Sequence, residues 1–190
     1  MKIGLFFGSF NPIHVAHMLL VQYVLEHTDI EKIWFVISPH NPLKDKNSLL
    51  SENERLKMVN MAIANNNKMR ASDIEFNLKK PSYTIDTLKF IKETYVNDEF
   101  VVVIGTDNLE NLHKWKDYQK ILEEYEIYAY SRPTSDGGEL KNHPKIKIID
   151  AHPNELSSTF IRDLIKENKN VEDLLCPAVW NYIKRKEFYK

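Results

Sequence analysis

Short apolar runs alternate along the chain with segments whose apolar residues recur at helical spacing. The runs at 33–38 and 100–105 are apolar on both faces, which is typical of strands covered on both sides. The pattern predicts strands near residues 3–7, 32–38, 70–78, 100–105, 126–131 and 145–150. It predicts helices near 15–27, 51–65 and 84–95, a broken helix over 107–124, and two closing helices near 158–167 and 171–186.

This alternation favours an α/β fold, with a Rossmann-like, doubly wound and mostly parallel sheet followed by C-terminal helices. No repeat, low-complexity segment or linker divides the 190 residues. We therefore expect a single domain over residues 1–190. Ligands of such sheets bind in the crevice beyond the carboxyl ends of the strands, so the segments after the strands are where chemistry is expected.

Composition narrows the class of partner. The chain has 26 Lys and Arg against 27 Asp and Glu, a formal net charge of -1, which argues against a nucleic-acid partner. A single cysteine, Cys176, permits no internal disulfide and no zinc site of its own. No apolar stretch approaches the roughly 18 residues of a membrane span, and the first apolar run is short for a secretory signal. We expect a cytoplasmic protein without a membrane partner; a homo-oligomer is left open.

The first predicted strand runs directly into a candidate phosphate site. The segment contains Gly8, Ser9, Phe10, Asn11, Pro12, His14 and His17. A glycine at position 8 lets the backbone approach a ligand closely, and the N–H groups of the following helix form an anion site. His14 and His17 share one face at the helix start, where imidazoles can donate to phosphate oxygens. The same pair could bind a metal or pack in the core, although no Cys, Asp or Glu lies near enough in sequence to complete a metal site.

A second candidate site follows the last predicted strand. Ser157, Ser158 and Thr159 form a helix-capping cluster, with Arg162 about one turn further on. Capping alone would explain the hydroxyls. With the guanidinium on the same short segment, hydroxyl, amide and cationic donors would converge on a phosphate.

These two segments resemble the signature motifs of the nucleotidyltransferase superfamily, H-x-x-H and S-T-x-x-R, here His14 to His17 and Ser158 to Arg162. The intervening segments resemble bacterial nicotinate-nucleotide adenylyltransferases, in the family's order and over nearly the whole chain. They are 38–44, 81–88, 104–108 with Trp115, and 130–133. Two positions depart from the usual pattern: Phe7 stands where many relatives have glycine, and Asn11 where many have aspartate. We expect local repacking there, since Gly8 and both histidines are retained.

The resemblance implies transfer of AMP from ATP to nicotinate mononucleotide, giving deamido-NAD and pyrophosphate by direct in-line displacement without a covalent intermediate. A phosphate monoester has a second pKa of about 6, so the attacking group is already ionised and no general base is needed. Alignment of the two anions and stabilisation of the phosphates then suffice. Mg²⁺ would accompany ATP, bridging phosphate oxygens with mostly water ligands, so no dedicated protein metal site is expected.

The resemblance also assigns roles to residues. His14, His17 and Arg162 would act on the reacting phosphates. ATP would be bound by Gly8, Ser9, Phe10, Gly105, Ser131, Ser158 and Thr159, with adenine near Phe160. Nicotinate mononucleotide would be bound by Asn41, Lys44, Thr84, Ile85, Asp107, Trp115, Lys116 and Arg132. In this scheme Trp115 stacks on the pyridine ring and backbone amides hold its carboxylate, favouring the acid over the amide.

Other interpretations stay open at this point. Trp115 is equally an aromatic that packs helices, and Lys44 and Lys116 are ordinary surface charges by position alone. A phosphopantetheine adenylyltransferase or a cytidylyltransferase would share the histidines, but those families lack the Ser-Tyr-Thr-x-Asp-Thr run at 82–87. A non-catalytic nucleotide sensor would keep the fold while it can lose phosphate-handling side chains. The chain is too short for an aminoacyl-tRNA synthetase.

Overall fold

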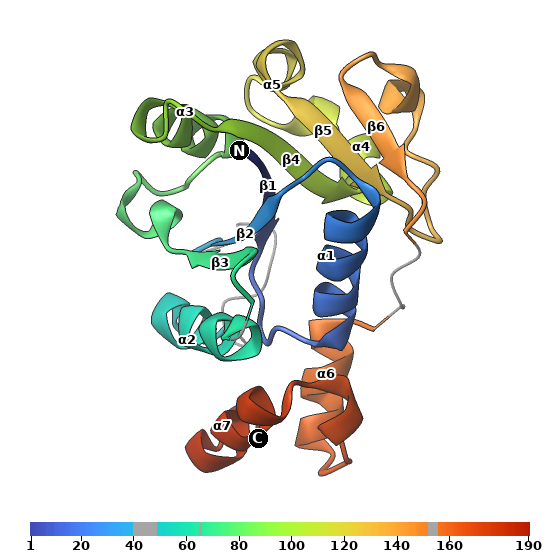
Figure 1. Cartoon of the computed structure of the whole chain (residues 1–190). Coiled ribbons are helices and arrows are strands. Elements are labelled where there is room, and N and C mark those ends of the chain that lie inside the picture. Colours follow the sequence, from blue (N-terminus) through green and yellow to red (C-terminus); the bar gives the residue numbers. More distant parts are fainter. Residues whose placement is uncertain (40–48, 65, 152–155) are drawn as a thin grey trace.

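The computed structural model describes residues 1–39, 49–64, 66–151 and 156–190. Its six strands form one sheet in the order β3-β2-β1-β4-β5-β6, and every neighbouring pair is parallel (Figure 1). The strands are β1 (Lys2–Gly8), β2 (Lys32–Ile37), β3 (Met69–Ser72), β4 (Glu99–Gly105), β5 (Glu126–Tyr130) and β6 (Ile146–Ile149). The doubly wound parallel sheet expected from the sequence is confirmed.

The strand order reverses direction between β1 and β4, which places the switch point at the centre of the sheet. β1 pairs with β2 up to Gly8 opposite Ile37, and β4 pairs with β5 up to Gly105 opposite Tyr130. The segments that leave these four strands therefore start at the same edge. In an open α/β sheet this position is where ligands bind.

Helices cover both faces of the sheet because the central strands are apolar on both sides. They are α1 (Val15–His27), α2 (Glu52–Ile63), α3 (Thr84–Thr94), α4 (Thr106–Glu110), α5 (Tyr118–Glu124), α6 (Ser158–Lys166) and α7 (Pro177–Lys186). In β4, Val101 and Val103 belong to the core that α1, α2, α6 and α7 share, whereas Val102 and Ile104 belong to the core that α3, α4 and α5 share. Alternate residues of one strand thus serve two separate cores. No helix within the described ranges combines the length and apolarity that a membrane crossing requires.

Two predicted elements are wrong in extent. The strand expected over 70–78 ends at Ser72, and a 3₁₀ turn at Ile74–Asn77 follows it. Ile74 and Phe76 mimic strand alternation, but Glu75 between them is buried and accepts hydrogen bonds from hydroxyl groups. The helix expected over 171–186 is divided, because Pro177 occupies the first turn of α7 and a proline fits a helix start but not its interior. Glu172–Leu174 forms a separate 3₁₀ turn.

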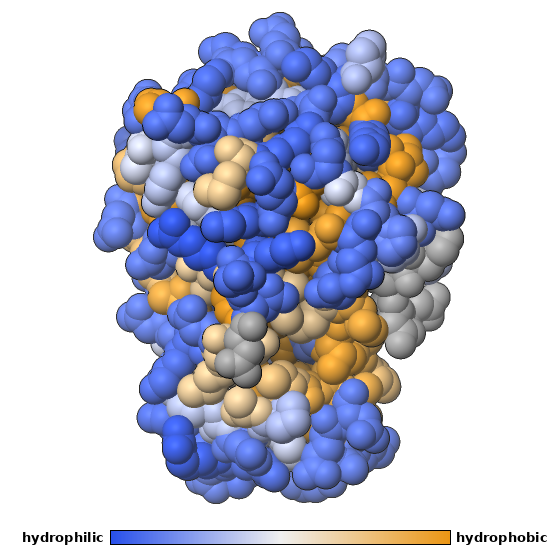
Figure 2. All heavy atoms as spheres, in the orientation of Figure 1, coloured by the Kyte–Doolittle hydropathy of each residue, from blue (hydrophilic) through white to orange (hydrophobic). Residues whose placement is uncertain are grey.

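The C-terminal helices α6 and α7 lie at the carboxyl edge of the sheet, beside the start of α1 and beside α2 (Figure 1). Polar side chains cover most of the face seen in Figure 2, with apolar side chains exposed over α1 and the nearby start of α6. Leu19 of α1 and Phe160 of α6 are among the exposed large hydrophobic residues.

Candidate active site

The loop after β1 is held in one conformation by Phe10. This residue has a positive φ of 45°, and its ring is buried against Phe6, Phe35 and His17. A Cβ at position 8 would lie 2.8 Å from the Phe10 ring, so the loop requires glycine there. The Phe10 side chain is therefore a core residue, and only its backbone can face a nucleotide.

The histidine pair opens α1. The backbone N–H of His14, the N-cap residue, donates to His17 Nδ1 over 3.3 Å, and the two rings stack with centroids 3.7 Å apart. His14 is 4% exposed, and its Nδ1 has no partner among the described residues. Burial and the positive charge of Arg132 lower the pKa of His14 to about 4. His14 is thus a neutral imidazole at pH 7, with one ring nitrogen available as a donor.

The start of α6 docks onto this same loop. Ser158 Oγ donates to the Pro12 carbonyl over 2.9 Å, and Arg162 Nη1 donates to the Asn11 carbonyl over 2.8 Å. Arg162 Nη2 also contacts Thr159 Oγ1 at 3.2 Å. A guanidinium has five N–H donors, so these bonds do not exhaust it. Segments about 150 residues apart in sequence are thereby joined beside the histidines, in the arrangement expected for a shared phosphate site.

The far side of the crevice is built from the ends of β4 and β5. Asp107 Oδ1 lies 4.0 Å from Arg132 Nε, and both atoms are buried with no hydrogen-bond partner among the described residues. A Cβ on Gly105 would lie 2.3 Å from Asp107 Oδ1, so glycine is what allows this close approach. Thr106 Oγ1 accepts from the Arg132 backbone N–H, which ties Arg132 to the start of α4.

Five buried side-chain polar atoms lack a hydrogen-bond partner within the described structure, and four of them lie at this edge: His14 Nδ1, Ser72 Oγ, Asp107 Oδ1 and Arg132 Nε. Arg132 connects two of the others, since its charge acts on His14 and its Nε faces Asp107. Buried polar groups are nearly always hydrogen-bonded, so a cluster of exceptions at a topological switch point is typical of a ligand site.

A separate part of the crevice is formed by the start of α3. Tyr83, the N-cap residue, makes no side-chain capping bond, so the N–H groups of Thr84 and Ile85 are not capped by it. Lys116 Nζ binds Asp86 at 2.9 Å and lies 4.7 Å from the centre of the Tyr83 ring. The half-buried Trp115 packs against the α3–α5 core. The structure thus places Lys116 beside Asp86 and Tyr83, the residues on either side of Thr84 and Ile85, while the binding of nicotinate mononucleotide by this group stays a prediction.

The remaining predicted residues have different outcomes. Ile85 is fully buried, so only its backbone can bind a ligand. Ser131 directly follows β5 at the same edge as Gly105. Ser9 immediately follows β1 and its carbonyl is bound by Arg55. Asn41 and Lys44 lie outside the described residues.

Arg55 is a residue that sequence reasoning missed. Its fully buried guanidinium donates to the carbonyls of Ser9, Ser38 and Pro39 at 2.6–2.9 Å, and its Nε donates to that of Leu50 at 3.0 Å. It therefore joins the loop after β1 to the loop after β2. The sequence does contain a signal for it: Arg55 lies on the same face of the predicted helix as the buried Met58 and Val59, where a surface arginine is not expected.

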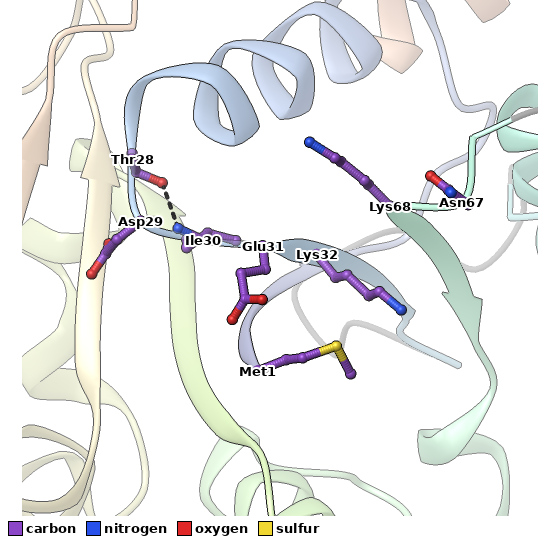
Figure 3. A pocket seen from close by; sticks show the side chains of 8 residues that line it. All are labelled: Met1, Thr28, Asp29, Ile30, Glu31, Lys32, Asn67 and Lys68. Atoms are coloured by element: carbon purple, nitrogen blue, oxygen red, sulfur yellow. Dashed lines mark hydrogen bonds between the residues drawn. The ribbon is translucent and has the colours of Figure 1, made fainter.

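A hollow of about 530 Å³ lies at the opposite, amino edge of the sheet (Figure 3). It is lined by Met1, Thr28, Asp29, Ile30, Glu31, Lys32, Asn67 and Lys68. The labelled side chains diverge rather than point toward a common centre, and both signs of charge are present. This hollow lacks the partnerless buried atoms that distinguish the carboxyl edge. Across the described ranges, no group of three or more His, Cys, Asp or Glu residues is placed to hold a metal ion.

Comparison with known proteins identifies the class first. A family model described as Cytidylyltransferase-like matches residues 5–164, and the chain belongs to that family. The match spans both the histidine motif and Arg162.

The names of its curated relatives are more specific than the description of the family. A probable nicotinate-nucleotide adenylyltransferase of Flavobacterium johnsoniae is 52% identical over 100% of both chains, and one of Flavobacterium psychrophilum is 47% identical over 100% of both. The solved structure of Plasmodium falciparum nicotinic acid mononucleotide adenylyltransferase complexed with NaAD is similar in fold. Its TM-score is 0.82 at 24% identity, covering 99% of this chain and 97% of that one. The family resemblance drawn from the motifs is confirmed.

Proposed function

We propose that this chain transfers AMP from ATP to nicotinate mononucleotide, releasing pyrophosphate and forming deamido-NAD. The observation that carries the proposal is the docking of the Arg162 segment on the loop that presents His14 and His17. The curated relatives, which bear the name of this activity over the full length of the chain, support it.

ATP would lie across the loop after β1, with its phosphates between the histidine pair and the start of α6. His17 and the neutral His14 donate hydrogen bonds to the α-phosphate, where charge develops in the transition state. Arg162 and the hydroxyls of Ser158 and Thr159 hold the outer phosphates. The rest of the nucleotide would extend along Gly105, Ser131 and the exposed ring of Phe160.

Nicotinate mononucleotide would lie on the other side of the crevice. The N–H groups at the start of α3, which the Tyr83 side chain does not cap, would suit its carboxylate, because helix N-termini favour anions. A nest that contains only donors binds a carboxylate better than an amide, whose N–H₂ would face other donors. Trp115 would stack on the ring, Asp107 would accept from a ribose hydroxyl, and Arg132 would neutralise the phosphate, with Asn41 and Lys44 as further contacts.

The reaction itself needs no protein base. An oxygen of the acceptor phosphate attacks the α-phosphorus, that P–O bond forms, and the bond to the bridging oxygen of pyrophosphate breaks in line with it. The protein aligns the two anions and stabilises the leaving group. Mg²⁺ would arrive with ATP, held by phosphate oxygens and water. Both substrates are small and charged, so we expect a cytoplasmic enzyme.

The test is a direct assay of the purified chain with ATP and Mg²⁺, offering nicotinate mononucleotide, nicotinamide mononucleotide or phosphopantetheine in parallel. We expect deamido-NAD and equimolar pyrophosphate with the first acceptor and a clearly lower kcat/KM with the second. Pyrophosphate release driven only by phosphopantetheine would overturn the proposal. Nucleotide binding without turnover on any acceptor would favour a sensor.

A further inference from the structure

The buried carboxyl of Glu75 has no role in the scheme above. Its side chain is 3% exposed and belongs to the 3₁₀ turn after β3. Oε1 accepts from Thr87 Oγ1 over 2.8 Å, and Oε2 accepts from Ser82 Oγ over 3.2 Å. No cation of the described chain lies within ion-pair distance of it. Burying a carboxyl without a cation is costly, so an apolar residue would serve packing better here.

Two of its hydroxyl partners bracket the start of α3, and a third, Ser38, directly follows β2. Ser82 precedes the N-cap residue, and Thr87 is buried in the first turn. Thr84 and Ile85, whose amides face the crevice in the proposed function, lie between them. One carboxyl thus fixes both ends of this short segment from inside. The Lys116–Asp86 pair and the Lys116 contact with the Tyr83 ring hold it from outside.

We propose that Glu75 is a positioning residue that sets the Thr84 and Ile85 amides for the carboxylate of the acceptor. This inference rests on the proposed function. A second negative charge would not attract an acceptor carboxylate, so the contribution is geometric: the carboxyl orients two hydroxyl-bearing residues and thereby the amides between them. Burial raises the pKa of Glu75, while the hydrogen bonds from Thr87, Ser82 and Ser38 oppose that change. Those donors therefore offset part of the cost of burying the group.

The test separates acceptor binding from general damage. We expect Glu75→Ala to raise KM for nicotinate mononucleotide by about tenfold or more, as for the loss of hydrogen bonds to a charged group. KM for ATP should change less than about twofold. Glu75→Gln keeps one acceptor oxygen and the shape of the side chain, so it should restore most of the acceptor affinity.

Partner and control variants sharpen the assignment. Thr87→Val should raise the acceptor KM by less than Glu75→Ala, and the double variant should be no worse than Glu75→Ala alone, because the two act through one bond. Thr94→Val removes a hydroxyl bond of 2.7 Å to the Phe90 carbonyl at the far end of the same helix. It should leave both KM values unchanged.

The outcomes are distinguishable. An active wild-type chain whose Glu75→Ala and Thr87→Val variants keep the acceptor KM, or raise both KM values equally, would overturn the inference and leave the proposed function standing. A wild-type chain that makes no deamido-NAD would overturn both. If Glu75→Ala does not fold, Glu75→Gln and Thr87→Val decide the matter by the same ratio of KM values.

Discussion

At the amino edge of the sheet the half-buried cation Lys2 is surrounded by carboxylates, whereas at the carboxyl edge the fully buried cation Arg55 is surrounded by backbone carbonyls. Lys2 Nζ lies 2.6–3.3 Å from carboxylate oxygens of Asp29, Glu99 and Glu126. Burial lowers the pKa of Lys2, but the bonds to Glu126 and Asp29 outweigh burial and raise it well above its usual value. The positive charge of Lys2 is thus compensated within the protein.

The carboxyl edge differs in how its arginines are bound. Arg55 and Arg162 donate to backbone carbonyl groups, whereas Arg132 pairs with Asp107 at 4.0 Å. Most of the buried polar atoms that lack hydrogen-bond partners in the described part of the chain lie at this same edge. Basic residues thus serve two purposes. At the amino edge Lys2 stabilises the sheet, and at the carboxyl edge the arginines create a positive electrostatic potential that favours a polyanionic ligand.

The largest expected effect comes from removing a donor at the carboxyl edge. We expect His17→Ala to lower kcat by at least about 100-fold, as for other single donors to a transition state. His27→Ala, at the exposed far end of the same helix, should change kcat little. Steady-state assays of both variants check this. Near-normal turnover of His17→Ala would show that the imidazole is only a packing residue.

The next effect concerns the acceptor. We expect Trp115→Ala to raise KM for nicotinate mononucleotide by about tenfold or more, since stacking of a base on an aromatic side chain contributes about 1–3 kcal/mol. Trp180→Ala removes a half-buried tryptophan of α7 and serves as the matched control. If both variants raise KM equally, or neither does, Trp115 is a packing residue.

A smaller effect is a pH dependence of stability at the carboxyl edge. The pKa of His14 is about 4 in the folded chain and about 6.5 in the unfolded one. Between these values the unfolded chain binds a proton that the folded chain does not. The contribution of neutral His14 to the free energy of unfolding is therefore fully present above about pH 6.5 and is lost as the pH drops toward 4.

Urea unfolding at pH 7.5 and pH 5 measures this term. From pH 7.5 to pH 5, the free energy of unfolding should fall by about 1–2 kcal/mol more for wild type than for His14→Asn. Equal losses would mean that His14 is not held neutral in the folded chain.

The sheet and its helices were accessible from sequence because long apolar runs and helical spacing are local signals. Val101 to Ile104 predict a strand covered on both faces, and the structure has one. The turn at Ile74–Asn77 was not accessible, because Ile74 and Phe76 have the period of a strand. The hydroxyls of Ser38, Ser82 and Thr87, which are hydrogen-bonded to its carboxyl, explain why Glu75 turns inward.

The candidate site was likewise predictable from the sequence only in part. The motif residues could be found because histidine, serine and arginine at fixed spacing already indicate phosphate chemistry. The docking of Arg162 on Asn11, the bond from Ser158 to Pro12, and the contact of Lys116 with α3 are long-range and need coordinates. Arg55 was missed because an arginine within a helix usually faces solvent, and its four carbonyl partners come from three separate segments.

The smallest effect on activity is expected from replacing Lys2, whose charge stabilises the amino edge of the sheet. Lys2→Met keeps the apolar stem and removes the cation, so Asp29, Glu99 and Glu126 face one another without it. We expect the free energy of unfolding to fall by about 1–2 kcal/mol, below the value for a fully buried pair because the carboxylates are partly exposed. Tm should fall by about 2–6 °C. Because this edge is far from the crevice, kcat and both KM values should stay within about twofold of wild type. A large loss of activity at unchanged stability would contradict the division of the two edges, since it would place a functional charge where the structure shows only a neutralised one.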